Sequence, residues 1–436
     1  MIVMKFGGTS VGSAEKIRAV LNIIGREAER APAVVVSAHA GVTDALLELG
    51  AVAPGGEVCT ERIESCHREI LRDLGLAEDL HDDLFSELRD LVRGMRLVGE
   101  ASPRAKDSLV SFGERCSART IAAFLSANGF PAQAVDAFDA GLRTDGNSGR
   151  ARPLPDEGRI AGYMAGIDGI PVVTGFIAKD VHGNITTLGR NGSDYTAALF
   201  GQALGAEEIQ IWTDVDGILT ADPKIVPDAR PIPAMSFDEA SELAYYGGRV
   251  LHPATILPAI EDAIPVRVLN TSRPDLPGTI ILAKFENTSS AVCSIVYKRA
   301  INLINLISPR MLQQHGFLAK VFTAAANREI DVDIVATSEV SITMTTASNE
   351  NLDAFAADLE SIGEVSVEPD HAMLCVVGQG IAHEKGVAAR VLTTIAESGV
   401  RVRVISQGAV KVNVATVIGE ADLECAVKAL HEAFFG

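Results

Sequence analysis

The chain has 436 residues, which is too long for one hydrophobic core and predicts two or three domains. Hydrophobic residues make up 47% and charged residues 22% of it, as in ordinary globular proteins. The formal net charge of −19 repels polyphosphate backbones and argues against nucleic-acid binding. No run approaches the ~20 apolar residues of a membrane span, so no membrane association is expected.

Six cysteines are scattered along the chain without a CxxC pair or a Cys/His cluster. This spacing argues against a zinc site and a disulfide framework, and it favours a reducing compartment. The first residues lack the basic and apolar regions of a signal peptide. We therefore expect a cytoplasmic protein.

The predicted elements begin with a strand over residues 2–6, which breaks at Gly7-Gly8 and is followed by a helix capped by Ser13. Helical patterns fill roughly residues 60–127. Short apolar runs, each typical of a buried strand, occur at 33–37, 170–174, 209–213 and 266–269. Alternating strands and helices predict an α/β domain with a mostly parallel sheet.

An internal repeat follows beyond about residue 285. Residues 316–323 (GFLAKVFT) align with residues 386–393 (GVAARVLT), and the register continues into the next strands. Each copy predicts a glycine turn, a helix and a strand pair, which favours two small βαββαβ domains in tandem. Chance similarity between two amphipathic helices is the alternative.

The first segment with chemical character is KFGGTS at 5–10. A strand that runs into two glycines exposes backbone N–H groups for an anion, and Lys5 adds a charge beside them. A Gly-Gly turn is by itself more often structural. The GxxxxGK[ST] phosphate-binding motif is absent.

The second segment is SAHAGVTD at 37–44, at the carboxyl end of a predicted strand, where ligands bind in open α/β sheets. Ser37 and Thr43 are candidates for substrate contacts. Alternatively, Thr43 or Asp44 caps a helix that begins at Ala45. His39 is expected to be a bystander.

The third segment is TTLGRNGSDYT at 186–196. Arg190 lies in a glycine-rich turn, where a guanidinium can bind a carboxylate with two parallel hydrogen bonds. Ser193 and Asp194 are placed at a helix start, so N-capping is their alternative role.

The fourth segment is WTDVDGILTADPK at 212–224. Its carboxylates at 214, 216 and 222 match Mg²⁺ ligands in number, but they equally match turn residues around Gly217 and Pro223. Lys224 is placed to reach a phosphate.

Together these segments resemble the aspartate kinase family of the amino-acid kinase superfamily. The motifs that carry the resemblance occur in the family's order: KFGGTS, VVVSA with GVTD, FGER at 112–115, VVTGFI at 172–177, TLGRNGSDYTAA, WTDVDGI and VLHP at 250–253. The repeated unit resembles ACT regulatory domains. Its segments MLQQHGFLAKVF and VDIVATSEVSI are similar to the lysine-responsive, single-chain branch.

The resemblance implies an amino-acid kinase fold over residues 1–285, followed by ACT domains over 286–366 and 367–436 that exchange edge strands. It implies transfer of the γ-phosphoryl of ATP, with Mg²⁺, to the β-carboxylate of L-aspartate. That nucleophile is ionised at neutral pH, so the reaction requires no general base.

The resemblance also implies roles for individual residues. Lys5 is expected to stabilise the transferring phosphoryl, Asp194 to orient this cation, Glu114 to meet the substrate ammonium and Arg190 a substrate carboxylate. The phosphate-binding positions are Gly7, Gly8 and Ser10. The substrate positions are Ser37, Thr43, Glu114, Phe176, Arg190 and Ser193. The nucleotide positions are Thr213, Asp214, Leu219, Lys224 and Arg249. No metal held by the protein is expected. Three nucleotide positions depart from the commoner pattern of the family, which has tyrosine where this chain has Leu219, arginine in place of Lys224 and lysine in place of Arg249.

For the repeated unit we expect an amino-acid effector, foremost L-lysine, with threonine or S-adenosylmethionine as alternatives, and a homodimer or larger assembly. Asp333 and Glu339 supply negative charge for a cationic side chain. Gln314 stands where the resemblance to the lysine-sensitive enzymes implies a smaller residue, which bears on the identity of the effector. The expected allosteric positions are Met311, Gly316, Phe317, Leu318, Val332, Asp333, Thr337, Ser338 and Glu339. Alternatively, the carboxylates are solvated and the unit only forms a dimer interface.

Two other functions compete. Acetylglutamate or glutamate 5-kinase would share the phosphate machinery, but FGER and the paired repeat argue against them. A non-catalytic amino-acid sensor is disfavoured because Lys5, Arg190 and Asp194 are all present.

Overall fold

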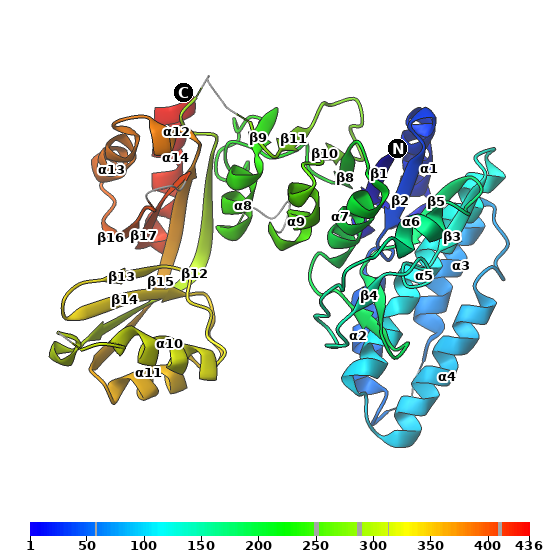
Figure 1. Ribbon diagram of the computed structural model, residues 1–436, viewed down its shortest axis with the longest axis horizontal. Coiled ribbons are helices and arrows are strands. Elements are labelled where there is room, and N and C mark those ends of the chain that lie inside the picture. The colour runs from blue at the N-terminus through cyan, green and yellow to red at the C-terminus, as the bar shows by residue number, and fades with distance from the viewer. Residues whose placement is uncertain (57–58, 248–252, 286–289, 313, 409–411) are drawn as a thin grey trace. The chain divides into compact units, whose positions relative to one another are not determined.

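The structure, a computed structural model, describes residues 1–56, 59–247, 253–285, 290–312, 314–408 and 412–436 (Figure 1). The chain forms two compact units. The first comprises residues 1–218 and 250–284, and the second comprises residues 219–249 and 285–436. In the described part of the chain, no helix has both the length and the apolar character of a membrane span.

The first unit contains a sheet whose strands follow the order β3-β5-β2-β1-β8-β10-β11. All neighbours are parallel except β10 and β11. The strands are β1 (Ile2–Phe6), β2 (Pro32–Val36), β3 (Ala132–Val135), β5 (Ile170–Thr174), β8 (Ile209–Thr213), β10 (Val266–Asn270) and β11 (Thr279–Leu282). The predicted, mostly parallel α/β fold is confirmed. A small second sheet contains β4 (Arg143–Thr144), β6 (Ile177–Asp180) and β7 (Ile185–Thr187).

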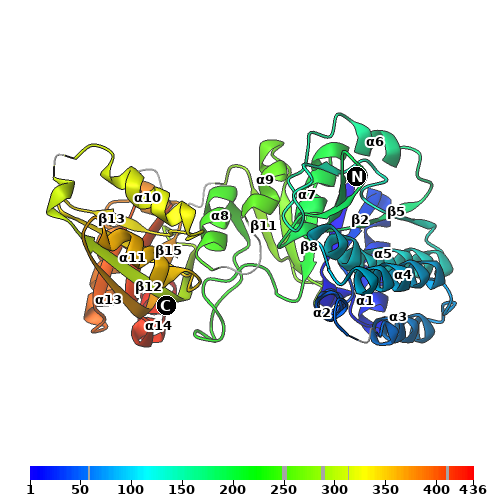
Figure 2. The same ribbon diagram turned by 90° about the horizontal axis from the view of Figure 1, so that it is seen from below.

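The helices of this unit pack around its sheet and on one another (Figure 2). They are α1 (Ala14–Arg26), α2 (Val42–Val52), α3 (Glu61–Leu74), α4 (Asp82–Val98), α5 (Pro103–Ala127), α6 (Arg159–Met164), α7 (Gly192–Leu204) and α9 (Pro253–Glu261). Ser13 caps α1 as predicted, since its side chain accepts a hydrogen bond from the Lys16 amide at 3.4 Å. Ser102 caps α5, and Pro103 occupies the first turn, where its missing N–H is not needed.

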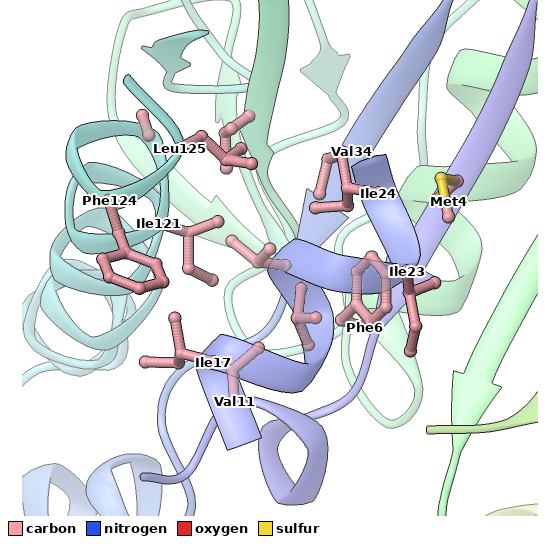
Figure 3. Packing of buried hydrophobic residues seen from close by; sticks show 14 of the residues in the cluster. Met4, Phe6, Val11, Ile17, Ile23, Ile24, Val34, Ile121, Phe124 and Leu125 are labelled. Carbon is pink, nitrogen blue, oxygen red and sulfur yellow. The ribbon is translucent and has the colours of Figure 1, made fainter. Parts of the chain in front are cut away.

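Successive side chains of β1 point to opposite faces of the sheet, so alternate residues face the hydrophobic core and the residues between them face the other side. Met4 and Phe6 pack against α1 and α5 in a buried cluster that includes Ile17 and Ile121 (Figure 3). Lys5, between them, points to the opposite face, where α7 contacts β1, β2 and β8. One face of the strand therefore stabilises the unit, while the other presents a lysine.

The second unit is built on a six-stranded antiparallel sheet in the order β13-β14-β12-β15-β17-β16. Its strands are β12 (Ser294–Ile307), β13 (Val335–Thr337), β14 (Ser341–Thr346), β15 (Glu364–Val377), β16 (Val402–Ser406) and β17 (Asn413–Gly419). The helices that follow residue 285 are α10 (Phe317–Asn327), α11 (Leu352–Glu360), α12 (Gly380–His383), α13 (Val387–Glu397) and α14 (Leu423–Phe435). The unit also contains β9 (Ala234–Ser236) and α8 (Phe237–Tyr245).

The long strands β12 and β15 each serve two cores. Residues 294–298 pair with 373–377, and residues 301–307 pair with 364–371 across an irregularity in the ladder. One half of the sheet packs on α10 and α11, and the other packs on α13 and α14. The first half of β12 therefore completes the core of the C-terminal repeat.

The repeat seen in the sequence is also a repeat of backbone conformation. Gly316 and Gly386 are the N-caps of α10 and α13, and both have positive φ, 76° and 90°. An L-residue adopts this conformation at a cost. The glycines that led the sequence alignment thus begin the two helices.

Candidate active site

The candidate site lies where parallel strands β1, β2, β5 and β8 end, because their carboxyl ends share one edge of the sheet. The motif residues follow these strands directly or lie on helices that pack beside them. The sequence predicts residues 37–44 at such a strand end, and the family resemblance groups the other segments with them.

Lys5 and Asp194 form a nearly buried ion pair. The Lys5 Nζ is 2.6 Å from Asp194 Oδ1, and the two side chains are 11% and 8% exposed. Asp194 lies in the first turn of α7, whose N-cap is Asn191 without a side-chain cap. The capping role considered for Ser193 and Asp194 is therefore not observed, and the Asp194 carboxylate holds a cation.

The Gly7-Gly8 turn brings β1 close to the loop after β2. A Cβ at Gly8 would lie 2.8 Å from the Ala38 carbonyl oxygen, and a Cβ at Gly7 would lie 3.5 Å from Lys5 Nζ. Only glycine at position 8 lets the backbone come this close to the Ala38 carbonyl group. The hydroxyl of Ser10 is buried and shares a 2.7 Å hydrogen bond with Thr271.

Two predicted substrate serines come together from different elements. Ser37 Oγ donates to Ser193 Oγ at 3.0 Å. Gly175, at the end of β5, allows this contact, since a Cβ there would lie 2.6 Å from the Ser193 side chain. Thr43 lies in the first turn of α2, which begins at Val42 with Gly41 as N-cap. The alternative that Thr43 or Asp44 caps a helix beginning at Ala45 is therefore wrong.

Glu114, from the FGER motif on α5, is a buried carboxyl group with one open oxygen. Its Oε1 accepts a hydrogen bond from the Ala38 amide at 3.3 Å, and its Oε2 has no partner among the described residues. Burial raises the pKa of Glu114 to about 8. A cation placed at Oε2 would stabilise the ionised form, so this position suits a substrate ammonium.

Phe176 and Arg190 complete the predicted substrate set. Phe176 has a φ of 66°, and its amide donates to Thr196 Oγ1 at 3.0 Å while its carbonyl accepts from Leu188. Arg190 is exposed, and no carboxylate of the described residues pairs with it. Its guanidinium fork is therefore available to an external anion.

Asp107 supports the segment before Arg190 and was not predicted. It accepts hydrogen bonds from Thr187 Oγ1 at 2.8 Å and from the Gly149 amide at 3.0 Å. Asp107 on α5 thereby fixes the end of β7. No local motif marks this aspartate, because its partners lie far away in the sequence.

Two of the three carboxylates of the fourth segment are engaged by other residues of the protein. Asp216 accepts from Asn270 Nδ2 at 2.6 Å and pairs with Arg273. Asp222 accepts from Tyr297 at 2.6 Å and from the Lys224 amide at 2.9 Å. These contacts favour the turn interpretation over a magnesium set.

The predicted nucleotide residues are distributed over both units. Thr213 and Asp214 follow β8 in the first unit, where Thr213 Oγ1 donates to the exposed Asp214 at 3.2 Å. Leu219 and Lys224 belong to the second unit; the Leu219 carbonyl accepts from Ser294, and Lys224 is exposed. Arg249 lies outside the described residues.

The predicted allosteric residues lie in the first repeat of the second unit. Phe317 is in its core, against which Met311 and Val332 pack. The exposed members are Gly316, Leu318, Thr337, Ser338 and Glu339. Asp333 already has a cationic partner, because Lys298 Nζ lies 3.0 and 3.1 Å from its two carboxylate oxygens.

Comparisons with known proteins identify the family of the chain. Residues 1–270 match the amino acid kinase family, and residues 374–434 match an ACT domain. The chain is 40% identical to aspartokinase 1 (chloroplastic) of Arabidopsis thaliana over 99% of its length and 80% of the relative's.

Two solved structures of Escherichia coli aspartokinase III also match, each at 34% identity and over 100% of both chains. The structure in complex with aspartate and ADP (R-state) gives a TM-score of 0.83. The structure in complex with lysine and aspartate (T-state) gives 0.82. The chain therefore belongs to the aspartokinases, within the amino acid kinase family.

Proposed function

We propose that this protein transfers the γ-phosphoryl group of ATP to the β-carboxylate of L-aspartate and so forms 4-phospho-L-aspartate, the first step toward lysine, threonine and methionine. The observation that carries the proposal is the buried Lys5–Asp194 pair. It places one oriented ammonium beside a Gly-Gly turn and the first turn of a helix. Backbone amides and a positive charge at such a point stabilise a phosphoryl group.

The roles of the surrounding residues follow from their contacts. Phosphoryl transfer requires mainly positioning and charge neutralisation, which Lys5 and the amides of Gly7 and Gly8 supply. Glu114 would bind the substrate ammonium through its open Oε2, and Arg190 would bind a carboxylate. Ser37 and Ser193 would line the pocket between them.

Mg²⁺ is proposed to arrive with the nucleotide. Asp216 and Asp222, two of the three carboxylates that match magnesium ligands in number, are engaged by Arg273, Asn270 and Tyr297. A magnesium ion usually keeps several waters and binds through substrate phosphates. When bound, it would neutralise charge on the β- and γ-phosphates.

The second unit is proposed to bind an end-product amino acid and to pair with a second copy of the chain. The lysine complex of the E. coli relative supports L-lysine as the effector. We also propose that the chain divides into a catalytic domain (1–285) and two ACT domains (286–366 and 367–436). None of the six cysteines forms a disulfide, which fits a reducing, cytoplasmic location.

The test is a coupled assay of ADP formation by the purified chain with L-aspartate, L-glutamate or N-acetyl-L-glutamate as acceptor. We expect ADP formation with L-aspartate and little with the other two. Lys5→Ala should lose most of this activity. Lys106→Ala, which changes an exposed lysine of the same unit, is the control and should keep it. Binding of L-aspartate without ADP formation would instead identify an amino-acid sensor and overturn the proposal.

A further inference from the structure

Four histidine and cysteine side chains from four separate elements meet in the core of the first unit. His39 follows β2, His67 lies on α3, His81 directly precedes α4 and Cys116 lies on α5. Each side chain is at most 1% exposed. The sequence gives no motif for this cluster, because its members are separated by tens of residues.

The potential ligand atoms are close together. One nitrogen of His67, one nitrogen of His81 and the sulfur of Cys116 all lie within 4.8 Å of one another. The ring of His39 is centred 5.2 Å from that of His67. Tetrahedral zinc with bonds of ~2.0–2.3 Å places its ligands roughly 3.5 Å apart, so a modest inward movement of the side chains would form a site.

The histidine nitrogens in this cluster lack partners. Both ring nitrogens of His67, the Nδ1 of His81 and the Nε2 of His39 have no hydrogen bond to any described residue. The surroundings are apolar and include Leu84, Phe85 and Val42. An unsatisfied buried polar atom is destabilising, so four in one place call for a bound group.

The remaining nitrogens of two rings are held in a way that suits metal binding. His39 Nδ1 lies 2.6 Å from the Val11 carbonyl oxygen, which can only accept, so Nδ1 carries the proton and Nε2 carries the lone pair. His81 Nε2 lies 2.9 Å from Thr120 Oγ1, which leaves Nδ1 open. Metal-bound histidines are usually oriented by such contacts of their second nitrogen.

We propose that His67, His81 and Cys116, with His39 as fourth ligand, bind one Zn²⁺-type ion in a closed structural site. Zn²⁺ binds imidazole nitrogen and thiolate sulfur, and structural zinc sites have four such ligands, usually with more thiolates than the single one here. Binding forms one metal–sulfur and three metal–nitrogen bonds, and the Cys116 thiol releases its proton to solvent. This inference departs from the expectation, drawn from the scattered cysteines, that the chain holds no metal.

The site would connect four elements beside the candidate active site. Cys116 lies two residues after Glu114 on α5, and His39 follows Ala38, whose amide hydrogen-bonds to Glu114. A metal at this point would fix the loop after β2 against α3, α4 and α5. Because the ligands are buried, we expect the ion to enter before folding is complete.

The first test is the metal content of the full-length chain, expressed in zinc-supplemented medium and freed of loose metal by gel filtration. Plasma mass spectrometry should find close to one zinc per chain. His67→Ala and Cys116→Ala should remove most of it. His431→Ala and Cys375→Ala, which change a buried histidine and a buried cysteine of the second unit, should retain it. A metal-free wild-type chain would overturn the proposal, whatever the variants do.

The second test identifies the ligands by cobalt substitution, with protein from cobalt-supplemented minimal medium. The wild type should show the intense visible bands of tetrahedral cobalt and a thiolate-to-cobalt charge-transfer band. Cys116→Ser should lose the charge-transfer band, whereas Cys66→Ser, one residue before His67, should keep it. His39→Ala should weaken metal retention during dialysis against a chelator. Unchanged spectra in Cys116→Ser would contradict the site, and unchanged retention in His39→Ala would exclude His39 as the fourth ligand.

Discussion

Each unit of this aspartokinase contains a lysine–aspartate pair next to the residues proposed to bind ligand. Lys5 and Asp194 lie 2.6 Å apart at the end of β1, and Lys298 and Asp333 lie 3.0 Å apart beside the irregularity in β12. Both aspartates are nearly buried, at 8% and 9% exposure, but Lys298 is 31% exposed and Lys5 only 11%.

We propose opposite roles for these two pairs. In the first unit the aspartate holds a lysine beside the Gly-Gly turn, so the lysine is the group offered to an anion. In the second unit the lysine neutralises an aspartate that a cationic effector would need. Loss of the lysine should therefore abolish function in the first unit and free a ligand site in the second.

The largest expected effect is that of Lys5→Ala. Because Lys5 is proposed to stabilise the transferring phosphoryl, its removal should lower kcat by about 10²–10³-fold, while circular dichroism and the melting temperature show a folded protein. The measurement is ADP formation at saturating ATP and aspartate. Turnover of Lys5→Ala near that of the wild type would contradict the role of this pair. The control is Lys298→Ala, which should keep wild-type turnover when it is assayed without effector.

Arg190→Lys should act on one substrate only. A planar fork that binds a carboxylate twice is not replaced by a point charge. Loss of hydrogen bonds to a charged group, ~1.5–3 kcal/mol, corresponds to a rise of roughly 10–100-fold in the KM for aspartate, with little change for ATP. Equal changes in both KM values would argue against contact between Arg190 and aspartate.

Much of the scaffold was predictable because it follows from local patterns. The strands at 2–6, 170–174 and 209–213 were placed correctly from short apolar runs between turns, and Ser13 was identified as a cap. Lys5 and Ser37 were placed at the ends of predicted strands, whereas β7 of the small second sheet, which precedes Arg190, was not predicted. These features depend on neighbours in the sequence.

Long-range contacts were not predictable in this way. The sequence did not show that Asp107 supports Thr187, that Lys298 occupies Asp333, or that His67 and Cys116 meet. Each of these pairs joins residues tens of positions apart and follows no periodic pattern. Only the packing of helices and strands brings such residues together.

Glu114→Gln tests the buried carboxyl group through pH. The pKa of Glu114 is raised from its usual 4.5 to about 8, so the folded state binds an extra proton between these values. The wild type should therefore lose stability relative to Glu114→Gln as pH rises from about 4.5 through about 8. Thermal melts of both proteins without ligand, at pH 4.5 and pH 9, measure this difference. A constant difference across this range would contradict the raised pKa.

The same substitution should remove a pH dependence of substrate binding. In the wild type, the affinity for the aspartate ammonium should rise as pH approaches 8, because Glu114 ionises. Glu114→Gln should bind aspartate more weakly and without this rise. Isothermal titration of both proteins with aspartate between pH 6.5 and pH 8.5 is the direct comparison.

Lys298→Met should increase the affinity for a cationic effector several-fold, because the effector would no longer compete with Lys298 for Asp333. Asp333→Ala should weaken binding. Calorimetric titrations with lysine, threonine and S-adenosylmethionine measure both effects. If lysine binds equally well to wild type, Lys298→Met and Asp333→Ala, the effector site lies elsewhere. If none of the three compounds binds or inhibits, regulation by these end products is excluded.

The smallest expected effect is that of Gly316→Ala. Gly316 has a φ of 76° and open space around its missing Cβ, so only backbone strain opposes alanine, about 1–2 kcal/mol. Gly94→Ala, in the helix α4 with equal space and no positive φ, should be neutral or stabilising. Thermal unfolding of both variants measures the difference, and equal melting temperatures would contradict the strain argument.

The central claim is that the site around Lys5 and Asp194 makes an acyl phosphate on the side chain of aspartate. The most direct measurement is to trap the product of the purified chain, ATP and L-aspartate with hydroxylamine and to identify the hydroxamate by mass spectrometry. We predict aspartate β-hydroxamate in amounts that match the ADP formed. ADP formation without any hydroxamate, or no aspartate-dependent ADP at all, would contradict the claim.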